Sequence, residues 1–255
     1  NSPDIESEIF LNKEKIFFTK SNKNIGLCSA VNHASTKSNT NFILYAHDDM
    51  YFLPKWDVFL FDEINLIPHN KFYLSLTQIS HNRGVKGNLQ HIHFDCGSDL
   101  KNFNENKLLD NFERFEFRDL QGSHWAPHII HKDTWKAIGG FSEEFNPGFG
   151  SDPDLNMKLW KYGVRIFKGI SKSRVYHFGS LTARKNKNVS RNNGKMTFLI
   201  KWKMTVDFFT KHYLRRGTVY YEPLKEPEKN FSYYLDYIFS KIKFFITKYF
   251  VWKKN

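Results

Sequence analysis

The sequence has little cysteine and no long apolar run, and each absence excludes a class of protein. Its 255 residues include two cysteines, Cys28 and Cys96, which stand in unrelated contexts without a CxxC spacing. Neither a disulfide framework nor a cysteine-based zinc site is therefore indicated, and a reducing, cytoplasmic location is expected. No apolar stretch approaches the roughly 18 residues that a membrane-spanning helix needs. Internal repeats and low-complexity segments are also lacking.

The amino-acid composition is typical of a globular chain and has an excess of positive charge. Hydrophobic residues make up 40% and aromatic residues 17% of the chain, which is enough to cover one substantial core. The length favours one α/β domain with a C-terminal appendage. Lysine and arginine number 38 against 26 acidic residues, a net charge of +12. This excess favours a polyanionic partner, which charge alone leaves open as nucleic acid, anionic lipid or a phosphorylated small substrate.

Apolar periodicity predicts alternating strands and helices in the first part of the chain. Residues 15–19 are predicted as a short strand, and a turn at 24–26 leads into a helix that carries Cys28 on its apolar face. The apolar run at 41–46 ends abruptly in polar residues, which is typical of a buried parallel strand. These elements predict a βαβ unit, followed by a further strand at 72–79.

In the middle of the chain, a polar segment without apolar periodicity is followed by a block of predicted strands and helices. Residues 82–117 are polar and rich in Asn and His, so we predict a loop region that shapes a substrate site. The block that follows predicts a strand at 128–130, a glycine turn at 139–141, a helix at about 153–162 and short strands that end at His177.

The C-terminal segment has a pattern of its own. Residues 222–229, with two prolines, are predicted as a linker, and residues 230–255 as a basic amphipathic helix. This helix either packs back onto the domain or lies in the plane of an anionic membrane, at its inner face. Trp252 and flanking lysines such as Lys254 favour the membrane. The apolar face is formed by Phe231, Leu235, Ile238, Ile242, Phe245, Ile246 and Tyr249.

A first polar cluster, His47-Asp48-Asp49, follows the predicted strand at 41–46. Open α/β sheets bind ligands at the carboxyl ends of their parallel strands, and carboxylate oxygens suit Mg²⁺ or Mn²⁺ that bridges a diphosphate. Such a cation neutralises the charge that develops on a nucleoside diphosphate leaving group. The alternative is that the two aspartates cap a turn, and the pair alone does not decide between these interpretations.

A second cluster lies in the stretch from Gly148 to Leu155. Asp152 before Pro153 suits a helix N-cap with proline at the first helical position, which explains Asp152 without catalysis. Asp154 adds a carboxylate in the first turn, and the preceding glycines allow a ligand to approach the backbone, as an acceptor site requires. Further along, His177 closes a predicted strand, where a histidine is either structural or a metal ligand.

Taken in this order, the blocks resemble the GT-A glycosyltransferases of family 2. The stretch 24–56, with NIGLCSAVNHAS and then NFILYAHDDMYFLPKW, is similar to the helix and strand that lead to that family's DxD-type metal motif. The stretch 139–163, GGFSEEFNPGFGSDPDLNMKLWKYG, is similar to its GGF...EDxDL...G acceptor and base motif, and His177 matches its metal-binding histidine. The resemblance covers about residues 1–180.

The resemblance implies a metal-dependent, inverting glycosyltransferase. Such an enzyme moves a sugar from a nucleotide-sugar, here a UDP-, GDP- or TDP-sugar, to a hydroxyl of a glycan or lipid-linked acceptor. Asp49 and His177 are implied as ligands of Mn²⁺ or Mg²⁺, and Asp48 is implied to lie near the ribose or the metal. Asp152 is implied as the general base that accepts the proton of the attacking hydroxyl.

The implied fold is GT-A, a Rossmann-like α/β fold with a mostly parallel sheet flanked by helices. Residues 1–221 are expected to form this domain, with a nucleotide-sugar half at 1–80 and an acceptor half at 81–190. The remaining implied positions are Gly26 and Asn32 near the nucleotide and Trp125 and Asp154 at the acceptor. Trp125 and Trp135 are candidates for sugar stacking or for core packing, and core packing is favoured for Trp135.

The sequence departs from the family pattern in three places. The family's first strand has no counterpart, so we expect part of the nucleotide-binding half to be missing. The metal motif is HDD, which places His47 where the family has its first carboxylate, and Ser151 replaces the Glu of the ED pair. These departures leave open a catalytically inactive GT-A-like scaffold. The charge and the aromatic content leave open a nucleic-acid-binding protein, although clustered carboxylates would repel phosphate unless a metal intervenes.

Overall fold

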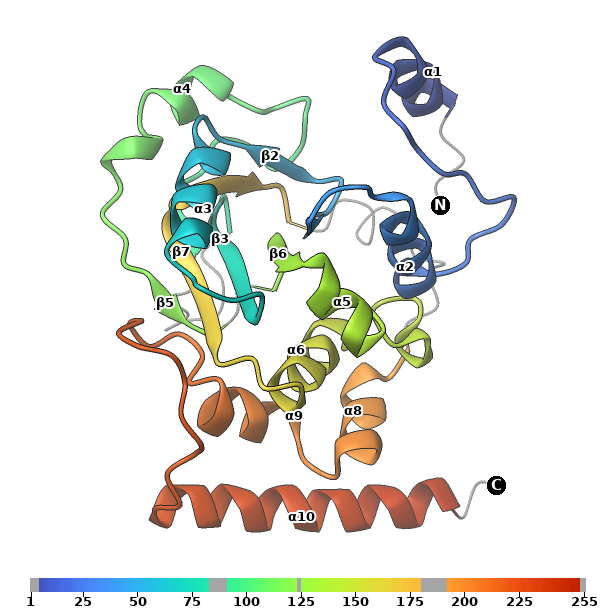
Figure 1. Ribbon diagram of the computed structural model, residues 1–255, viewed down its shortest axis with the longest axis vertical. Coiled ribbons are helices and arrows are strands. Elements are labelled where there is room, and N and C mark those ends of the chain that lie inside the picture. The colour runs from blue at the N-terminus through green and yellow to red at the C-terminus, as the bar shows by residue number, and fades with distance from the viewer. Residues whose placement is uncertain (1–4, 83–90, 123–124, 180–191, 253–255) are drawn as a thin grey trace.

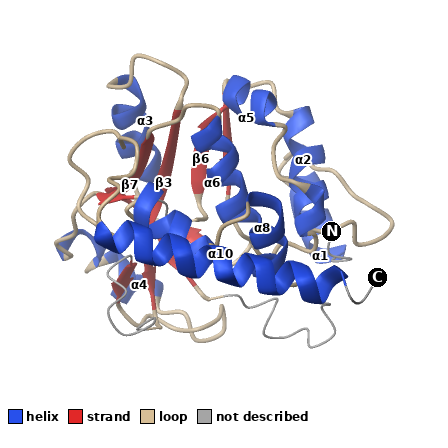
Figure 2. Cartoon of the chain, turned by 90° about the horizontal axis from the view of Figure 1, so that it is seen from below, coloured by secondary structure: helices blue, strands red, loops and turns tan. Residues whose placement is uncertain are grey.

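A mixed β-sheet lies at the centre of the molecule, with helices on both of its faces (Figures 1 and 2). The computed structural model describes residues 5–82, 91–122, 125–179 and 192–252. Within these residues the sheet has seven strands. In chain order they are β1 (Phe42–Tyr45), β2 (Met50–Phe52), β3 (Phe72–Ser80), β4 (His91–His93), β5 (Leu120–Gln121), β6 (His128–His131) and β7 (Ile166–His177).

The strands are ordered β1-β6-β3-β7-β2, with β4 beside β3 and β5 beside β7. β3 is parallel to β4 and β7 and antiparallel to β6, which is also antiparallel to β1. β1, β3, β4 and β7 therefore share one direction, and β2, β5 and β6 run the opposite way. The α/β class with a sheet flanked by helices is confirmed. The sheet is mixed, because four strands share one direction and β6 inserts antiparallel between β1 and β3. A short buried strand has the same composition in either direction, so its sequence does not reveal this.

Helices form two layers with separate cores. In chain order they are α1 (Ile5–Lys13), α2 (Leu27–Lys37), α3 (Trp56–Asn65), α4 (Glu105–Leu109), α5 (Lys132–Ile138), α6 (Ser151–Lys161), α8 (Gly194–Trp202), α9 (Val206–Phe208) and α10 (Phe231–Trp252). α3 packs Leu60 and Ile64 against one face of the sheet. The larger core on the other face receives Cys28 from α2, Trp135 from α5 and Leu155 from α6. Figure 2 shows α3 on one side of the strands and α2, α5 and α6 on the other.

Most of the predicted elements are present. The strands predicted at 41–46, 72–79 and 128–130 correspond to β1, β3 and β6, and the helix predicted at 153–162 corresponds to α6. The short strands predicted to end at His177 are one strand of 12 residues, β7. Trp135 is buried in the core as expected.

The strand predicted at 15–19 is absent, and the irregular region predicted at 82–117 contains short regular elements. Residues 16–20 have no regular structure, and Phe17 is 75% exposed, so the chain has no strand at 15–19 to complete a βαβ unit with β1. A strand needs a neighbour for its backbone hydrogen bonds, and this segment lies away from the sheet (Figure 1). The described part of the region 82–117 contains β4, α4 and a short 3₁₀ helix (Phe112–Arg114), and its other described residues are irregular, as predicted.

The C-terminal helix is present as α10 and packs along one side against α8 and α9. Tyr233, Ser240 and Phe244 are buried in this contact, and Ser240 Oγ accepts a hydrogen bond from Thr205 N at 2.8 Å. No described helix has the length and apolar character that a membrane span requires. Lys254 lies outside the described residues. The predicted boundaries at 221 and 229 stay predictions, and Leu224 of the intervening segment packs in the larger core.

Candidate functional site

Two histidines and one carboxylate meet where β1 and β7 end. The chain leaves β1, passes through His47 and Asp49 and enters β2, whose first residue, Met50, pairs with His177, the last residue of β7. His177 Nε2 lies 3.2 Å and His47 Nδ1 4.0 Å from Asp49 Oδ1. One donor atom from each of these three residues lies within 4.8 Å of the others. We call this group the His-Asp-His cluster.

Gln78 on β3 sets the orientation of the His177 ring. Gln78 Nε2 donates a hydrogen bond to Ala126 O at 2.5 Å, so its Oε1 is left to accept one from His177 Nδ1 at 3.2 Å. Because Nδ1 donates to Gln78, the neutral form of the ring directs the lone pair of Nε2 toward the Asp49 carboxylate. This nitrogen is buried and makes no hydrogen bond within the described part of the chain. Two electron-rich atoms that face each other in this way are stabilised by a cation between them.

The ring of His47 is also held from its far side. Its Nε2 lies 2.9 Å from the hydroxyl of Tyr45, which leaves Nδ1 directed toward Asp49. Burial lowers the pKa of His47, and the charge of Asp49 acts in the opposite direction. Burial raises the pKa of Tyr45, and the nearby Asp152 raises it further, so the phenol keeps its proton. A neutral imidazole with one nitrogen hydrogen-bonded is the form in which histidine binds metals.

Asp152 stands in the first turn of α6 and interacts electrostatically with Tyr45. Its side chain is half-buried, and Oδ1 is enclosed without a hydrogen bond to any described residue. Burial raises the pKa of the Asp152 carboxyl to about 7, while the positive charge of Arg216 acts in the opposite direction. A carboxylate whose pKa lies near neutrality is suited to accept a proton at physiological pH.

Arg216 joins Asp152 to Trp125. Its guanidinium lies 4.1 Å from the centre of the Trp125 ring, a cation–π contact. Burial lowers the pKa of Arg216 to about 10, although Tyr73 and Asp152 oppose this effect. The Trp125 backbone is fixed by a hydrogen bond from the Tyr73 hydroxyl to its carbonyl oxygen at 2.7 Å. Sequence analysis missed Arg216, because it lies outside every recognised motif and reaches the site only through the fold.

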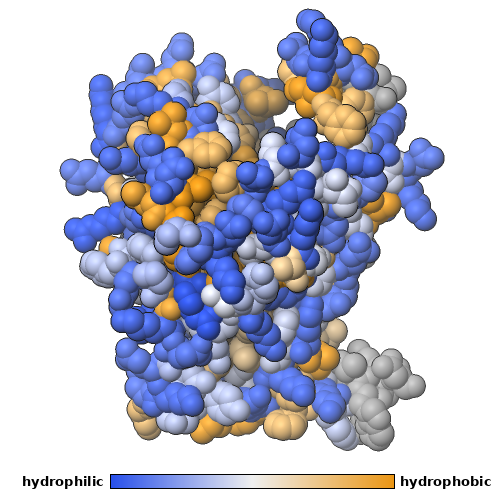
Figure 3. All heavy atoms as spheres, viewed as in Figure 1, coloured by the Kyte–Doolittle hydropathy of each residue, from blue (hydrophilic) through white to orange (hydrophobic). Residues whose placement is uncertain are grey.

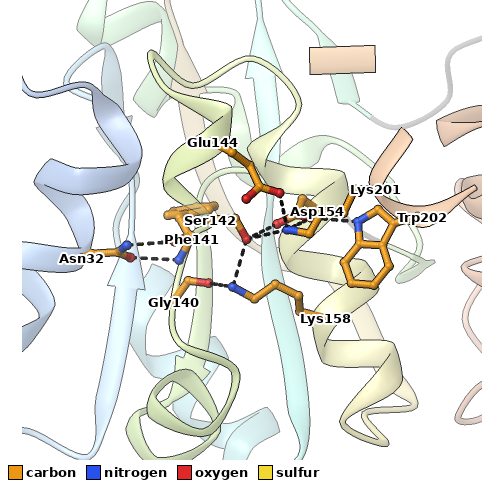
Figure 4. A network of polar contacts seen from close by, with 9 residues as sticks. All are labelled: Asn32, Gly140, Phe141, Ser142, Glu144, Asp154, Lys158, Lys201 and Trp202. Carbon is orange, nitrogen blue, oxygen red and sulfur yellow. Dashed lines mark hydrogen bonds and ion pairs between the residues drawn. The ribbon is translucent and has the colours of Figure 1, made fainter. Parts of the chain in front are cut away.

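Asp154 belongs to a buried network (Figure 4). Its carboxylate has no exposed surface and accepts hydrogen bonds from Trp202 Nε1 at 2.8 Å and Ser142 Oγ at 2.6 Å. Lys201 Nζ lies 2.8 Å from the same carboxylate and 2.9 Å from Glu144. The structure therefore contradicts a direct contact between Asp154 and an acceptor, because α6 turns this side chain inward toward α8.

The two positions expected near the nucleotide hold backbone segments together. Asn32 exchanges two hydrogen bonds with the backbone of Phe141, at 2.8 and 2.9 Å, and so ties α2 to the turn at 139–141. Gly26 precedes α2 with a φ of +82°, and a Cβ there would lie 2.3 Å from Asn146 Oδ1, so glycine is required. A position of Asn32 or Gly26 beside a nucleotide stays a prediction.

Of the predicted ligands, the structure brings Asp49 and His177 together and adds His47 to them. Sequence analysis treated His47 as a lost carboxylate, whereas its imidazole supplies a donor atom of its own. The HDD motif could have indicated His47 as a third ligand, since histidine is itself a common metal ligand. Asp48 is exposed and lies outside the His-Asp-His cluster, and a role for it at the ribose stays a prediction.

Comparison with known proteins identifies the fold. No family model matches the sequence, and no curated protein matches it. The chain is similar to a crystal structure described as GalNAc-T7 with UDP, GalNAc and Mn²⁺, with 12% sequence identity and a TM-score of 0.55.

The fold is of the GT-A type.

The match covers 82% of this chain and 42% of that one, so the present chain spans less than half of its length. At this identity the likeness concerns the fold alone. Within this GT-A fold, the His-Asp-His cluster lies at the carboxyl ends of β1 and β7, where open α/β sheets bind their ligands.

Proposed function

We propose that this chain is a metal-dependent glycosyltransferase that moves a sugar from a nucleotide-sugar to a hydroxyl group of a glycan or lipid-linked acceptor. The observation that carries the proposal is the His-Asp-His cluster, in which Gln78 holds the His177 ring so that Nε2 faces Asp49. The fold supports the reaction class, since the GT-A structure it resembles is described with UDP, GalNAc and Mn²⁺. The proposed donor is accordingly a UDP-, GDP- or TDP-sugar.

The three donors fit a divalent cation. His47 and His177 would each supply a neutral imidazole nitrogen, and Asp49 a carboxylate oxygen. Mg²⁺ prefers ligand sets made of oxygen, so two imidazoles among three donors favour Mn²⁺ over Mg²⁺. The cation, when bound, neutralises negative charge on the diphosphate leaving group. Tyr45 and Gln78 orient the two histidine rings through hydrogen bonds. Loss of a hydrogen bond that orients a metal ligand commonly lowers metal affinity by about tenfold or more.

Asp152 is proposed as the general base. Its carboxylate is available to take the proton of the acceptor hydroxyl as that oxygen attacks the anomeric carbon, and direct displacement inverts the configuration there. The pKa of about 7 means that a large fraction of the group is ionised at neutral pH, yet the group still binds a proton appreciably. Arg216 limits the rise in this pKa and keeps one face of Trp125 covered.

A metal titration followed by a transfer assay tests the proposal. Mn²⁺ binding is measured by calorimetry, and turnover is measured on a panel of UDP-, GDP- and TDP-sugars with simple glycan acceptors. We expect Asp49→Ala to abolish both, and Asp152→Asn to abolish transfer while Mn²⁺ binding persists. Asp62→Asn, which changes an exposed carboxylate on α3, is the matched control and is expected to retain both.

Different outcomes separate the alternatives. Mn²⁺ and nucleotide binding without turnover under any condition would identify an inactive GT-A-like scaffold. Failure to bind Mn²⁺, together with salt-dependent binding to nucleic acid, would replace the proposal with nucleic-acid binding.

Both cysteines are buried free thiols, which supports the proposed cytoplasmic location.

A further inference from the structure

Helix α10 has two sides, and the domain covers one of them. Tyr233, Ser240 and Phe244 form the buried side, which packs on α8 and α9. The opposite side carries large apolar side chains with exposed fractions of 42–67%. At about 100° per residue these side chains fall within an arc of about 120° facing away from Ser240. They are Leu235, Ile238, Phe239, Ile242, Phe245 and Ile246.

This apolar arc is continuous and lies on the outside of the molecule. Figure 1 shows α10 crossing one end of the protein, and Figure 3 shows hydrophobic side chains along the same edge. Monomeric soluble proteins rarely expose apolar patches of more than a few hundred Å². A helix of 22 residues with such a face therefore needs an explanation beyond chance exposure.

Positive charge borders the arc on both sides. Lys248 lies along one border and Lys243 along the other, and both are exposed. Lys241 belongs to the contact with the domain, because its Nζ donates a hydrogen bond to Lys203 O at 3.1 Å. The one carboxylate in α10, Asp236, is on the packing side, where Lys211 and His212 contact it at 2.6 and 2.7 Å. The outward side is therefore apolar at its centre, basic at its edges and free of negative charge.

We propose that α10 lies in the plane of an anionic lipid bilayer, with this apolar arc inserted at the level of the headgroups and the flanking lysines against lipid phosphates. An interfacial helix combines this apolar face with this basic border. Paired faces of two copies would instead bring their lysine borders together, and like charges oppose that contact. The net charge of +12 acts in the same direction as the lysines of α10.

The proposal also orients the catalytic machinery. In Figure 1, β2, which directly follows Asp49, lies in the upper part of the molecule and α10 crosses its lower end. Figure 2 is viewed from below and shows α10 in front of the other elements. A bilayer beneath α10 therefore leaves β2, and with it the adjoining His-Asp-His cluster, on the part of the molecule away from the headgroups. The acceptor hydroxyl would then be presented away from the headgroups, for example at the distal end of a membrane-attached glycan.

Vesicle sedimentation of the full chain tests the proposal, with phosphatidylcholine vesicles compared with vesicles that also contain phosphatidylglycerol. We expect binding to the anionic vesicles that weakens with salt. The double variant Ile242→Asp/Phe245→Asp is expected to lose at least about tenfold in affinity. Lys243→Gln and Lys248→Gln should each lose about fivefold. Leu66→Asp, at an apolar position that is 78% exposed but lies outside α10, is the matched control and should bind as the parent does.

Circular dichroism and thermal unfolding establish that each variant is folded, since all of the substituted side chains are exposed. Equal binding by the Ile242→Asp/Phe245→Asp variant and the parent would overturn the proposal, as would the absence of binding to anionic vesicles. A stable dimer in light scattering that this variant converts to a monomer would assign the face to a second copy instead. None of these measurements depends on transfer activity, so the bilayer contact and the proposed reaction stand or fall separately.

Discussion

Replacing Asp154 with alanine removes a carboxylate that three side chains contact inside the molecule. The Asp154 side chain has no exposed surface, and its partners are Trp202 Nε1, Ser142 Oγ and Lys201 Nζ, at 2.6–2.8 Å. Lys201 is one-quarter exposed and keeps a second partner in Glu144 at 2.9 Å. The alanine variant therefore leaves the buried indole N–H without an acceptor and takes one of two carboxylates from the lysine.

The magnitude follows from these contacts. Breaking a fully buried ion pair costs about 3–5 kcal/mol, and a hydrogen bond to a charged group contributes about 1.5–3 kcal/mol. The contributions overlap, and Lys201 retains solvent and Glu144, so the lower end of the first range applies. We expect Asp154→Ala to lower the free energy of unfolding by about 3 kcal/mol. Asp154→Asn keeps an acceptor for Trp202 but loses the charge, and should cost about 1–2 kcal/mol.

Urea denaturation followed by tryptophan fluorescence and circular dichroism measures these differences. Asp62→Ala, an exposed carboxylate on α3, is the control and should remain within about 0.5 kcal/mol of the parent. In a double-mutant cycle, Lys201→Met should cost about 1 kcal/mol less in the Asp154→Ala background than in the parent. A loss below about 1 kcal/mol for Asp154→Ala, or no coupling to Lys201, would refute the structural role assigned to this carboxylate.

Three further predictions concern the site and its support. His47→Ala should weaken Mn²⁺ binding by about tenfold or more in calorimetry, and unchanged affinity would remove His47 from the ligand set. Transfer should rise with pH through about 7 as Asp152 ionises. Because the folded protein holds this proton more tightly than the unfolded chain, stability should fall between about pH 4 and pH 7, and a pH series of unfolding curves should lack this fall in Asp152→Asn. Gly26→Ala should destabilise the protein by about 2 kcal/mol or more, seen as a lower Tm, since its Cβ would collide with Asn146 at a φ of +82°.

The sequence alone was sufficient to predict helices and strands that depend on the side chains of neighbouring residues. The presence of β1 and the almost entirely buried β3 follow from composition and length. β1 is not the buried parallel strand that its apolar run predicted, because it pairs antiparallel with β6 and leaves Leu44 37% exposed. The helix α6 was predicted from its composition, but its start was not. α6 begins at Ser151 with Gly150 at the N-cap and no side-chain cap, so Asp152 lies in the first turn and is not the N-cap that the Asp152-Pro153 pair predicted. The candidate metal ligands Asp49 and His177 were implied by the resemblance to the family 2 motifs. His177 closes β7, whereas Asp49 directly precedes β2.

Other features depend on residues that are distant in the sequence. β6 runs antiparallel between β1 and β3, and no property of its four residues specifies that direction. Asp154 meets Lys201 and Trp202 only because α8 packs on α6, so a carboxylate predicted to face an acceptor became an internal one. Arg216 likewise reaches Trp125 through the fold.

The His-Asp-His cluster shows most clearly which features the local sequence predicts and which depend on the tertiary structure. Local sequence placed a histidine and a carboxylate after β1, because side-chain chemistry and strand endings are properties of neighbouring residues. The pairing of β2 with β7 then brought His177 within 3.2 Å of Asp49, and Gln78 of β3 turned the ring so that Nε2 faces the carboxylate. Distances between ligands on separate strands are set by strand pairing and core packing, which are long-range interactions, and short-range preferences in the chain do not encode them.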